Sequence, residues 1–252
     1  MPRARFGDAI GGFRRRLNRH PASHALRPAT PALGFAAAFA LVIVLAVMPF
    51  DEMVFRAVRA SRLPALAFMR AITDVGKSGW YLVPAALLLL ASAAADWSLR
   101  GRRGKARLAR FFGRSAFLFA AIAFSGLIVN ALKIVFGRSR PRLFDQDGAW
   151  HFEPFTFGSA HASFPSGHST TMGAVAAVLF LWFPRWRWLT GPLGLFLAAT
   201  RIPALAHYPS DVVAGFALGF FYTVYLARWL AARRLAFRSE RAALLPRLRA
   251  GA

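Results

Sequence analysis

The sequence predicts an all-α, polytopic membrane protein that folds as a bundle of six transmembrane helices. Of its 252 residues, 57% are hydrophobic, whereas soluble domains contain roughly 45–50% apolar residues. Six stretches of 13 to 23 residues contain no charged side chain, and the basic residues gather in the links between them. These three observations exclude an ordinary water-soluble globule.

The six uncharged stretches differ in length. A bilayer core about 30 Å thick needs roughly 20 helical residues to cross it. The first three stretches are long enough, whereas the last three, of 16, 13 and 16 residues, reach full length only with flanking His, Arg and Asp residues. One short stretch could be a buried helix of a soluble protein, but six in series favour a membrane bundle. They are Pro28–Phe50, Ser78–Ala95, Ser115–Leu132, Ser169–Pro184, Trp188–Thr200 and Val212–Ala227.

Tryptophan residues and one proline support these boundaries. Trp80 and Trp97 flank the second stretch and Trp229 closes the sixth, and indole rings favour the membrane–water interface. The link Asp51–Lys77 is broken by Pro64 and carries apolar residues at helical spacing. We therefore expect this link to form short helices that lie on the membrane surface.

The basic residues are distributed unequally along the chain. A formal net charge of +23 and a pI near 12.0 are typical of nucleic-acid-binding proteins. However, the basic residues are divided among separate segments, so we expect no continuous groove and no nucleic-acid partner. Of the 33 Lys and Arg residues, 23 lie in the segments 1–27, 96–114, 185–187 and 228–252. Because positive segments stay in the cytoplasm, both termini are expected to be cytoplasmic.

This orientation predicts a multi-pass protein of a bacterial inner membrane, with the remaining links facing the periplasm. We expect one membrane domain over residues 1–252, and the sequence carries no signal of oligomeric state. This domain consists of a basic N-terminus (1–27), a six-span core (28–230) and a basic tail (231–252). The links expected to face the periplasm are 51–77, 133–168 and 201–211.

Both ends of the chain leave an alternative to weigh. The basic N-terminus followed by Leu33–Val47 is similar to a secretory signal, but no clean small-x-small cleavage site follows, so an uncleaved first span is expected. The tail is suited to binding anionic lipid headgroups, or it is a frayed terminus.

The chain contains no cysteine, which excludes disulfides, thiolate metal sites and cysteine nucleophiles.

Polar residues stand at the outward ends of the predicted spans. The alternation of a six-span bundle brings these ends to one membrane face, where ionisable groups are usually paired or functional. Three cations, two histidines and one carboxylate therefore converge on the periplasmic side. They belong to four clusters, which are Lys133 with Gly137–Pro141, Pro165–His168, Thr200–Arg201 and His207–Asp211.

Three of these clusters have the chemistry of a phosphate-binding site. Lys133, Arg140 and Arg201 offer positive charge and N–H donors to phosphoryl oxygens. The turn formed by Pro165, Ser166 and Gly167 runs into a helix, whose free N–H groups attract anions. Gly167 lets the backbone approach the anion without a side chain in the way. The hydroxyls of Ser169, Thr170 and Thr171 are available to cap this helix.

The fourth cluster has the chemistry of an oriented nucleophile. Pro209 suits the first turn of the sixth helix, which places His207 just before that helix and Asp211 within its first turn. The Asp211 carboxylate can then hold one imidazole nitrogen of His207 and leave the other free to attack.

The joint pattern resembles the type 2 phosphatidic acid phosphatase family of membrane-embedded lipid phosphatases. That family's three motifs are K-x6-R-P, P-S-G-H and S-R-x5-H-x3-D. Lys133 to Pro141 matches the first and Pro165–His168 matches the second. Thr200–Asp211 matches the third, with Thr200 in place of the usual serine, which keeps the hydroxyl.

The resemblance implies a role for each matched residue. His207 would attack phosphorus and form a phosphohistidine, Asp211 would orient it, and His168 would protonate the leaving group. The phosphoryl oxygens would be held by Lys133, Arg140, Ser166, Gly167 and Arg201. No cofactor is expected. No metal is expected either, because Asp145–Gly148 resembles only the start of a calcium loop and the later ligands are missing.

The expected activity is metal-independent dephosphorylation of a membrane lipid phosphate or diphosphate. Undecaprenyl diphosphate, phosphatidylglycerol phosphate, lipid A 1-phosphate and phosphatidic acid remain open as substrates. A lipid phosphotransferase and a non-catalytic lipid-binding protein are the alternatives. The link Arg142–Phe164 is expected to help select the substrate with aromatic side chains resting in the membrane interface, and His151 and His161 are expected to be surface residues. These aromatic residues are Phe144, Trp150, Phe152, Phe155 and Phe157.

Overall fold

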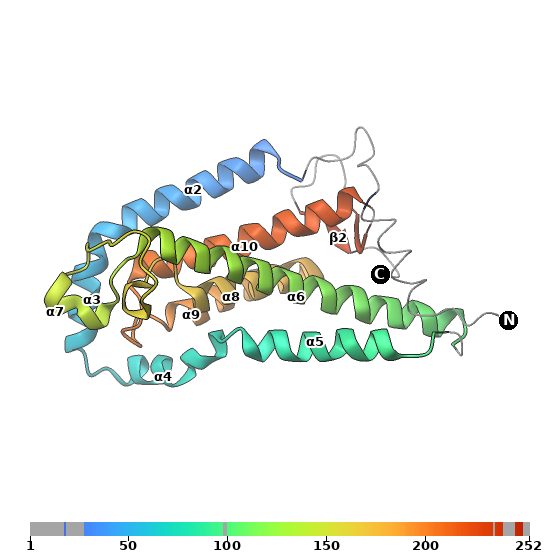
Figure 1. Ribbon diagram of the computed structural model, residues 1–252, viewed down its shortest axis with the longest axis horizontal. Helices are drawn as coiled ribbons and strands as arrows, with labels where there is room; N and C mark the ends of the chain where they lie inside the picture. The colour runs from blue at the N-terminus through green and yellow to red at the C-terminus, as the bar shows by residue number, and fades with distance from the viewer. Residues whose placement is uncertain (1–17, 19–27, 98–99, 234, 239–244, 249–252) are drawn as a thin grey trace.

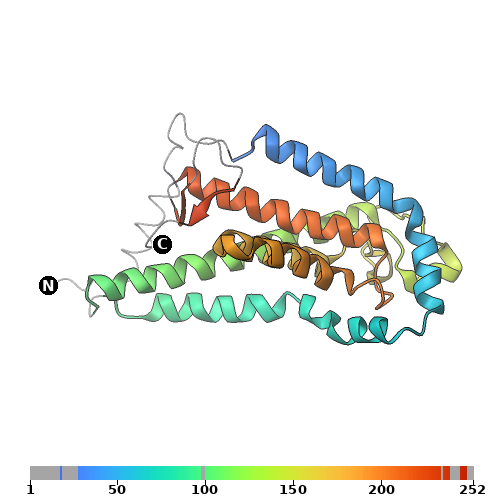
Figure 2. The same ribbon diagram turned by 180° about the vertical axis from the view of Figure 1, so that it is seen from behind.

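The computed structural model describes Asn18 and residues 28–97, 100–233, 235–238 and 245–248. In this part the chain is mostly helical and forms an elongated bundle in which α2 and α5 lie on opposite sides, with α6, α8, α9 and α10 between them (Figures 1 and 2). The predicted cytoplasmic N-terminus at 1–27 lies outside the described residues apart from Asn18. The six main helices are α2 (Pro31–Val47), α5 (Gly79–Ala94), α6 (Arg102–Phe136), α8 (Gly167–Trp182), α9 (Arg187–Ala199) and α10 (Pro209–Ala232).

Helices α8 and α10 approach each other closely because glycine lies at their contact. A Cβ atom added at Gly219 would lie 2.0 Å from the carbonyl oxygen of Thr170, and one at Gly215 would lie 2.3 Å from that of Ser166. Small residues allow such close backbone packing between membrane helices. The Ser166 amide also donates to the Asp211 carbonyl (3.0 Å). The packing therefore joins the start of α8 to the first turns of α10.

Helix α6 begins earlier than the sequence predicts. We expected a span over 115–132 preceded by a link at 96–114, but the helix already begins at Arg102. Arg, Lys, Ala and Leu are good helix formers, and charge alone does not end a helix. The helix stops at Gly137, which adopts the left-handed conformation (φ 57°) and donates its N–H to the Lys133 carbonyl (2.8 Å). This is a glycine cap.

Short helices gather at the end of the bundle where α10 begins (Figure 1). The predicted link 51–77 is helical, as expected, and its position on the membrane surface stays a prediction. It contains α3 (Asp51–Ala60), α4 (Pro64–Ile72) and the 3-10 turn η2 (Thr73–Gly76), and η1 (Met48–Phe50) precedes it. The loop between α6 and α8 contains η3 (Pro141–Leu143), α7 (Phe144–Asp147) and η4 (Ser159–His161), and η5 (Pro184–Trp186) joins α8 to α9.

The aromatic residues of the loop 142–164 do not all face the membrane interface. Phe155 and Phe157 are highly exposed, but Phe144 is buried, with its ring centroid 4.4 Å from that of Phe55. Phe152 lies against the guanidinium group of Arg138, 5.4 Å from its ring centroid. The expectation was wrong for Phe144 because the loop folds back over the end of the bundle, where the Phe144 ring packs against Phe55.

Within the described residues, four helical segments are long and apolar enough to cross a membrane, so the chain is a multi-pass membrane protein. They are Pro31–Ala60, Pro64–Ala94, Arg103–Phe136 and Pro209–Ala232. Helices α8 and α9, with 16 and 13 residues, fall below the roughly 20 residues that a full crossing needs. Ten of the 16 residues of α8 are buried, so the surrounding helices shield it. Six complete spans remain a prediction.

The described part of the tail packs against the bundle. Strands β1 (Phe237–Arg238) and β2 (Arg247–Leu248) form a short antiparallel pair, which departs from the all-α prediction. The Phe237 side chain is fully buried, and its ring centroid lies 4.8 Å from that of Phe117 in α6. Apolar side chains in the predicted basic tail explain this packing, so the described tail residues are not frayed.

The glycine contact gives a first prediction. Gly215→Ala would force a Cβ atom against the Ser166 carbonyl, so it is expected to displace the start of α8 and to lower at least tenfold the phosphatase activity that the motifs predict. Gly126→Ala is the matched control, because no atom lies within 4 Å of its added Cβ. Phosphate release by the two purified variants measures the effect, and equal activities would contradict the proposed packing constraint.

Candidate active site

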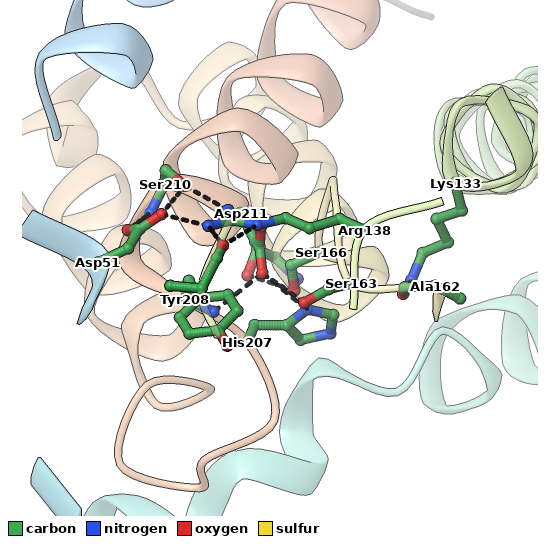
Figure 3. Close-up of polar contacts among 12 residues, drawn as sticks. Asp51, Lys133, Arg138, Ala162, Ser163, Ser166, His207, Tyr208, Ser210 and Asp211 are labelled. Atoms are coloured by element: carbon green, nitrogen blue, oxygen red, sulfur yellow. Dashed lines mark hydrogen bonds and ion pairs between the residues drawn. The ribbon is translucent and has the colours of Figure 1, made fainter. Parts of the chain in front are cut away.

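The predicted phosphate-binding and nucleophile clusters meet at the end of the bundle where α6 ends and α8 and α10 begin. The Lys133 ammonium group, in the last turn of α6, donates to the Ala162 carbonyl (2.7 Å). Its Cε atom would lie 3.8 Å from a Cβ added at Gly167. The loop 138–164 therefore passes between the end of α6 and the start of α8, and Figure 3 shows several of these side chains converging.

His207 and Asp211 are held together by the start of α10. His207 lies two residues before the helix, which begins at Pro209, and its Nδ1 is 3.6 Å from Asp211 Oδ2. The same oxygen accepts hydrogen bonds from the Tyr208 amide (2.9 Å) and from Ser163 Oγ (2.6 Å). Asp211 therefore caps its own helix and lies against the imidazole, as the spacing predicted.

His207 is kept neutral by its surroundings. Its side chain is almost completely buried, and burial lowers the pKa of the imidazole to about 3. The neighbouring Asp211 carboxylate raises this pKa, whereas Lys133 and Arg140 lower it further. At neutral pH the ring is therefore unprotonated, which is the form with a free lone pair for attack on phosphorus.

The residue that holds Asp211 in place is Arg138. Its fully buried guanidinium group donates to Asp211 Oδ1 (2.7 Å), to Asp51 Oδ2 (2.8 Å) and to the Ala149 carbonyl (2.7 Å). One face of the group lies 4.4 Å from the ring centroid of Tyr208. Figure 3 shows Arg138 between the two carboxylates. Such a buried cation is tolerated because its donors are paired.

Asp51 extends this network to the first part of the chain. It is the first residue of α3 and is fully buried. Its carboxylate accepts hydrogen bonds from the backbone N–H of Ser210 (2.9 Å), from Ser210 Oγ and from Arg138. The turn that follows α2 is thus attached to the first turn of α10.

Asp51, Arg138 and Ser163 are site residues that the sequence analysis did not identify. Asp51 carries a usable signal, because it is a carboxylate directly after the first uncharged stretch, on the predicted outward face. Arg138 lies within the first motif cluster, two residues before Arg140. Ser163 has no such signal, because a serine in a loop is ordinary in any sequence.

Three buried nitrogen atoms at this end have no hydrogen-bond partner among the described residues. They are Arg140 Nε, Arg201 Nε and His168 Nε2. Burial lowers the pKa of both Arg140 and Arg201, and the charge of Arg140 lowers that of Arg201 further. Unpaired buried donors cost free energy, and two neighbouring cations repel each other. This arrangement suits an anion that would accept from both guanidinium groups.

The turn at Ser166 and Gly167 forms the start of α8, with Ser166 as its N-cap residue. The Ser166 hydroxyl accepts from the Ser169 amide (3.4 Å) and the Ser169 hydroxyl (2.9 Å). The expectation that Ser169, Thr170 or Thr171 would cap the helix was wrong, because the helix already begins at Gly167 and these residues follow the cap position. Thr170 and Thr171 donate instead to the carbonyls of the preceding turn.

The acidic segment Asp145–Gly148 is engaged in other contacts. Asp145 accepts two hydrogen bonds from Arg59 (2.8 and 2.9 Å), and Asp147 accepts from Ser139 (2.6 Å). Within the described ranges, no group of three or more His, Asp or Glu residues could hold a metal ion. His161 Nδ1 lies 3.0 Å from the Glu153 carboxylate in the same loop.

Comparison with known proteins agrees with this architecture. Residues 114–235 match the model of the PAP2 superfamily. The chain is 38% identical over 187 residues to a lipid A 1-phosphatase of Rhizobium johnstonii, covering 73% of this chain and 75% of that protein. It is 38% identical over 58 residues to an undecaprenyl-diphosphatase of Sulfolobus acidocaldarius, covering 23% of this chain and 28% of that one.

A solved structure shares the fold. The transmembrane PAP2-type phosphatidylglycerolphosphate phosphatase of Bacillus subtilis superposes with a TM-score of 0.50 at 19% sequence identity, covering 76% of this chain and 90% of that one. The chain belongs to the PAP2 superfamily, as the three motifs predicted. It is a membrane lipid phosphatase.

The Arg138 network gives a second prediction. In Asp51→Asn, Arg138 loses one of its two carboxylate partners, and breaking a buried ion pair typically costs about 3–5 kcal/mol. We expect a lower unfolding temperature in detergent and a phosphatase activity reduced at least tenfold, because Arg138 no longer holds Asp211.

The neighbouring Glu52 supplies the control for this prediction. Its ion pair with Arg56 is exposed, and such pairs contribute only about 0–1 kcal/mol. Glu52→Gln should therefore leave both unfolding temperature and activity nearly unchanged. Similar losses in both variants would contradict a special role for the buried pair.

Proposed function

We propose that this protein removes the 1-phosphate from lipid A at the periplasmic face of a bacterial inner membrane. The observation that carries the proposal is the 38% identity over 187 residues to a lipid A 1-phosphatase. The site supports it because it combines a neutral, oriented histidine with two buried arginine Nε atoms that have no hydrogen-bond partner among the described residues. The unequal distribution of Lys and Arg supports cytoplasmic termini and a periplasmic site.

In the first step, Nε2 of His207 attacks the phosphorus atom and the bond from phosphorus to the leaving oxygen breaks. Burial lowers the pKa of His168 to about 4, so His168 must take up a proton when the phosphate dianion binds. It then donates that proton to the leaving oxygen, and the leaving group departs as an alcohol. Asp211 stabilises the positive charge that develops on the imidazole, as a carboxylate does in other histidine pairs. The product of this step is a phosphohistidine.

In the second step, water attacks the phosphohistidine. His168 accepts a proton from the water, the bond between phosphorus and Nε2 breaks, and inorganic phosphate leaves. The positive charges of Lys133, Arg140 and Arg201 stabilise the phosphoryl oxygens in both steps, together with the Ser166 side chain and the Gly167 amide. Positioning and charge stabilisation supply most of the rate in phosphoryl transfer.

A second candidate substrate is undecaprenyl diphosphate. The short match to an undecaprenyl-diphosphatase supports it, but that match covers 23% of this chain, whereas the lipid A 1-phosphatase match covers 73%. A lipid phosphotransferase would use the same phosphohistidine with another hydroxyl in place of water. Phosphate release from a panel of lipid phosphates, assayed beside transfer to lipid acceptors, separates these activities.

The nucleophile assignment gives a third prediction. His207→Ala is expected to abolish phosphate release, by more than about 10³-fold, because no other group can form the phosphoenzyme. His161→Ala is the matched control in the neighbouring loop and should keep near wild-type activity. A phosphohistidine is unstable in acid but survives in base. The phosphoenzyme formed from radiolabelled substrate should therefore be detected after a basic quench and lost after an acidic one. Turnover retained by the His207 variant would rule out this assignment.

Metal independence gives a fourth prediction. The positive charge at the site comes from Lys133, Arg140 and Arg201, so phosphate release should persist at full rate in excess chelator. The measurement compares initial rates before and after dialysis against the chelator. A rate that disappears and returns only with an added divalent cation would contradict the mechanism.

A further inference from the structure

A small cleft lies beside the candidate active site, on the wall formed by α4, η2 and the start of α5. It has a volume of about 290 Å³. Most of its lining is apolar or aromatic, and Asp74 is its one carboxylate among the lining residues. These residues are Ala71, Ile72, Asp74, Val75, Trp80 and Tyr81.

This wall is attached to the phosphate-binding residues. Thr73 Oγ1 accepts hydrogen bonds from Arg201 Nη1 (3.2 Å) and from the Thr200 hydroxyl (3.1 Å). A Cβ added at Gly76 would lie 3.0 Å from the Cβ of His168, so the wall packs directly on that histidine. The Asp74 carboxylate interacts electrostatically with both His168 and Arg201. The cleft therefore adjoins the His168 side of the site.

The direction of the reaction places the leaving group on this side. In phosphoryl transfer the attacking and leaving atoms lie roughly in line, on opposite sides of phosphorus. His207 attacks from the side where Asp211 and Ser163 hold it. The group that protonates the leaving oxygen must lie on the opposite side, and His168 packs against the cleft wall. The alcohol released in the first step therefore faces the cleft.

The lining suits an alcohol that is apolar on its faces and polar at its edges. The Trp80 side chain is 68% exposed, which leaves its ring available for stacking. The Tyr81 hydroxyl donates to the Val75 carbonyl (2.9 Å), which fixes the second ring. Asp74 Oδ2 accepts from Lys77 (2.6 Å), and a carboxylate has capacity for further donors.

We propose that this cleft is the subsite for a sugar leaving group, with the C–H face of a pyranose ring on Trp80 and its hydroxyl or amide donors at Asp74. The inference rests on the proposed function, because lipid A carries its 1-phosphate on an acylated glucosamine. Isoprenoid alcohols and diacylglycerol lack a ring with several polar donors. The cleft therefore favours a lipid-linked sugar phosphate over phosphatidic acid or an isoprenoid phosphate.

Paired variants test this specificity. Trp80→Leu keeps an apolar side chain but removes the aromatic face, and Asp74→Asn keeps the shape but removes the charge. Each is expected to lower kcat/KM about tenfold for lipid A 1-phosphate and less than twofold for phosphatidic acid. Trp188→Leu is the control for Trp80→Leu, because Trp188 is also highly exposed, at 70%. Asp145→Asn is the control for Asp74→Asn, because Asp145 is also an exposed, ion-paired aspartate. Neither control should change the ratio between the substrates.

An inhibition assay separates failure of the subsite from failure of the proposed function. Phosphate-free lipid A should inhibit phosphate release from whichever lipid phosphate the wild type hydrolyses, and Trp80→Leu should raise its inhibition constant about tenfold. A wild type that does not hydrolyse lipid A 1-phosphate overturns the proposed function, while the inhibition still tests the cleft. Two results would overturn the subsite. One is an equal loss of activity on all substrates, so that the substrate ratios do not change. The other is inhibition by phosphate-free lipid A that is absent or is not weakened by Trp80→Leu.

Discussion

The site depends on one buried guanidinium group placed between two buried carboxylates. Arg138 joins Asp51, at the start of α3, to Asp211, at the start of α10, and none of the three side chains is exposed. Each charge alone would be costly at this depth, so the three segments are stable only when they are assembled. Arg138 contacts both carboxylates, and the Asp211 carboxylate is also adjacent to His207. The same contacts hold His207, the proposed nucleophile, beside a carboxylate that would oppose the positive charge developing on it.

The matched motif residues could be identified from the sequence because their spacing is local and their face follows from span alternation. The partners of Arg138 could not, since Asp51 lies 87 residues before it and Asp211 lies 73 residues after it. No periodicity links residues so far apart, and only folding reveals that they meet. The predicted start of α6 was wrong for a different reason. Charged residues mark where a span leaves the membrane, but they do not mark where a helix begins, so Arg102–Arg114 continues the helix.

The two short central helices explain how a polar site exists in an apolar protein. Helix α8 is too short to cross a bilayer alone, and its buried residues include Ser169, Thr170 and Thr171. Their hydroxyl groups donate to a neighbouring serine hydroxyl and to backbone carbonyls, so these three hydroxyls are buried without being left unpaired. Its N-terminus is thereby held inside the bundle by the surrounding helices. The first turn of the helix then lies beside Lys133, whose Cε atom would be 3.8 Å from a Cβ added at Gly167.

Gly137 shows that the position most sensitive to substitution need not carry any chemistry. It has a positive φ of 57°, and a Cβ atom there would lie 1.6 Å from the Glu153 carbonyl oxygen. No L-residue fits without moving the chain on either side, and the next residue is Arg138. Sequence variation at this position is therefore limited by geometry and not by reactivity. A survey that ranked residues by tolerance to substitution would place Gly137 beside the proposed catalytic side chains, although glycine itself carries no reactive group.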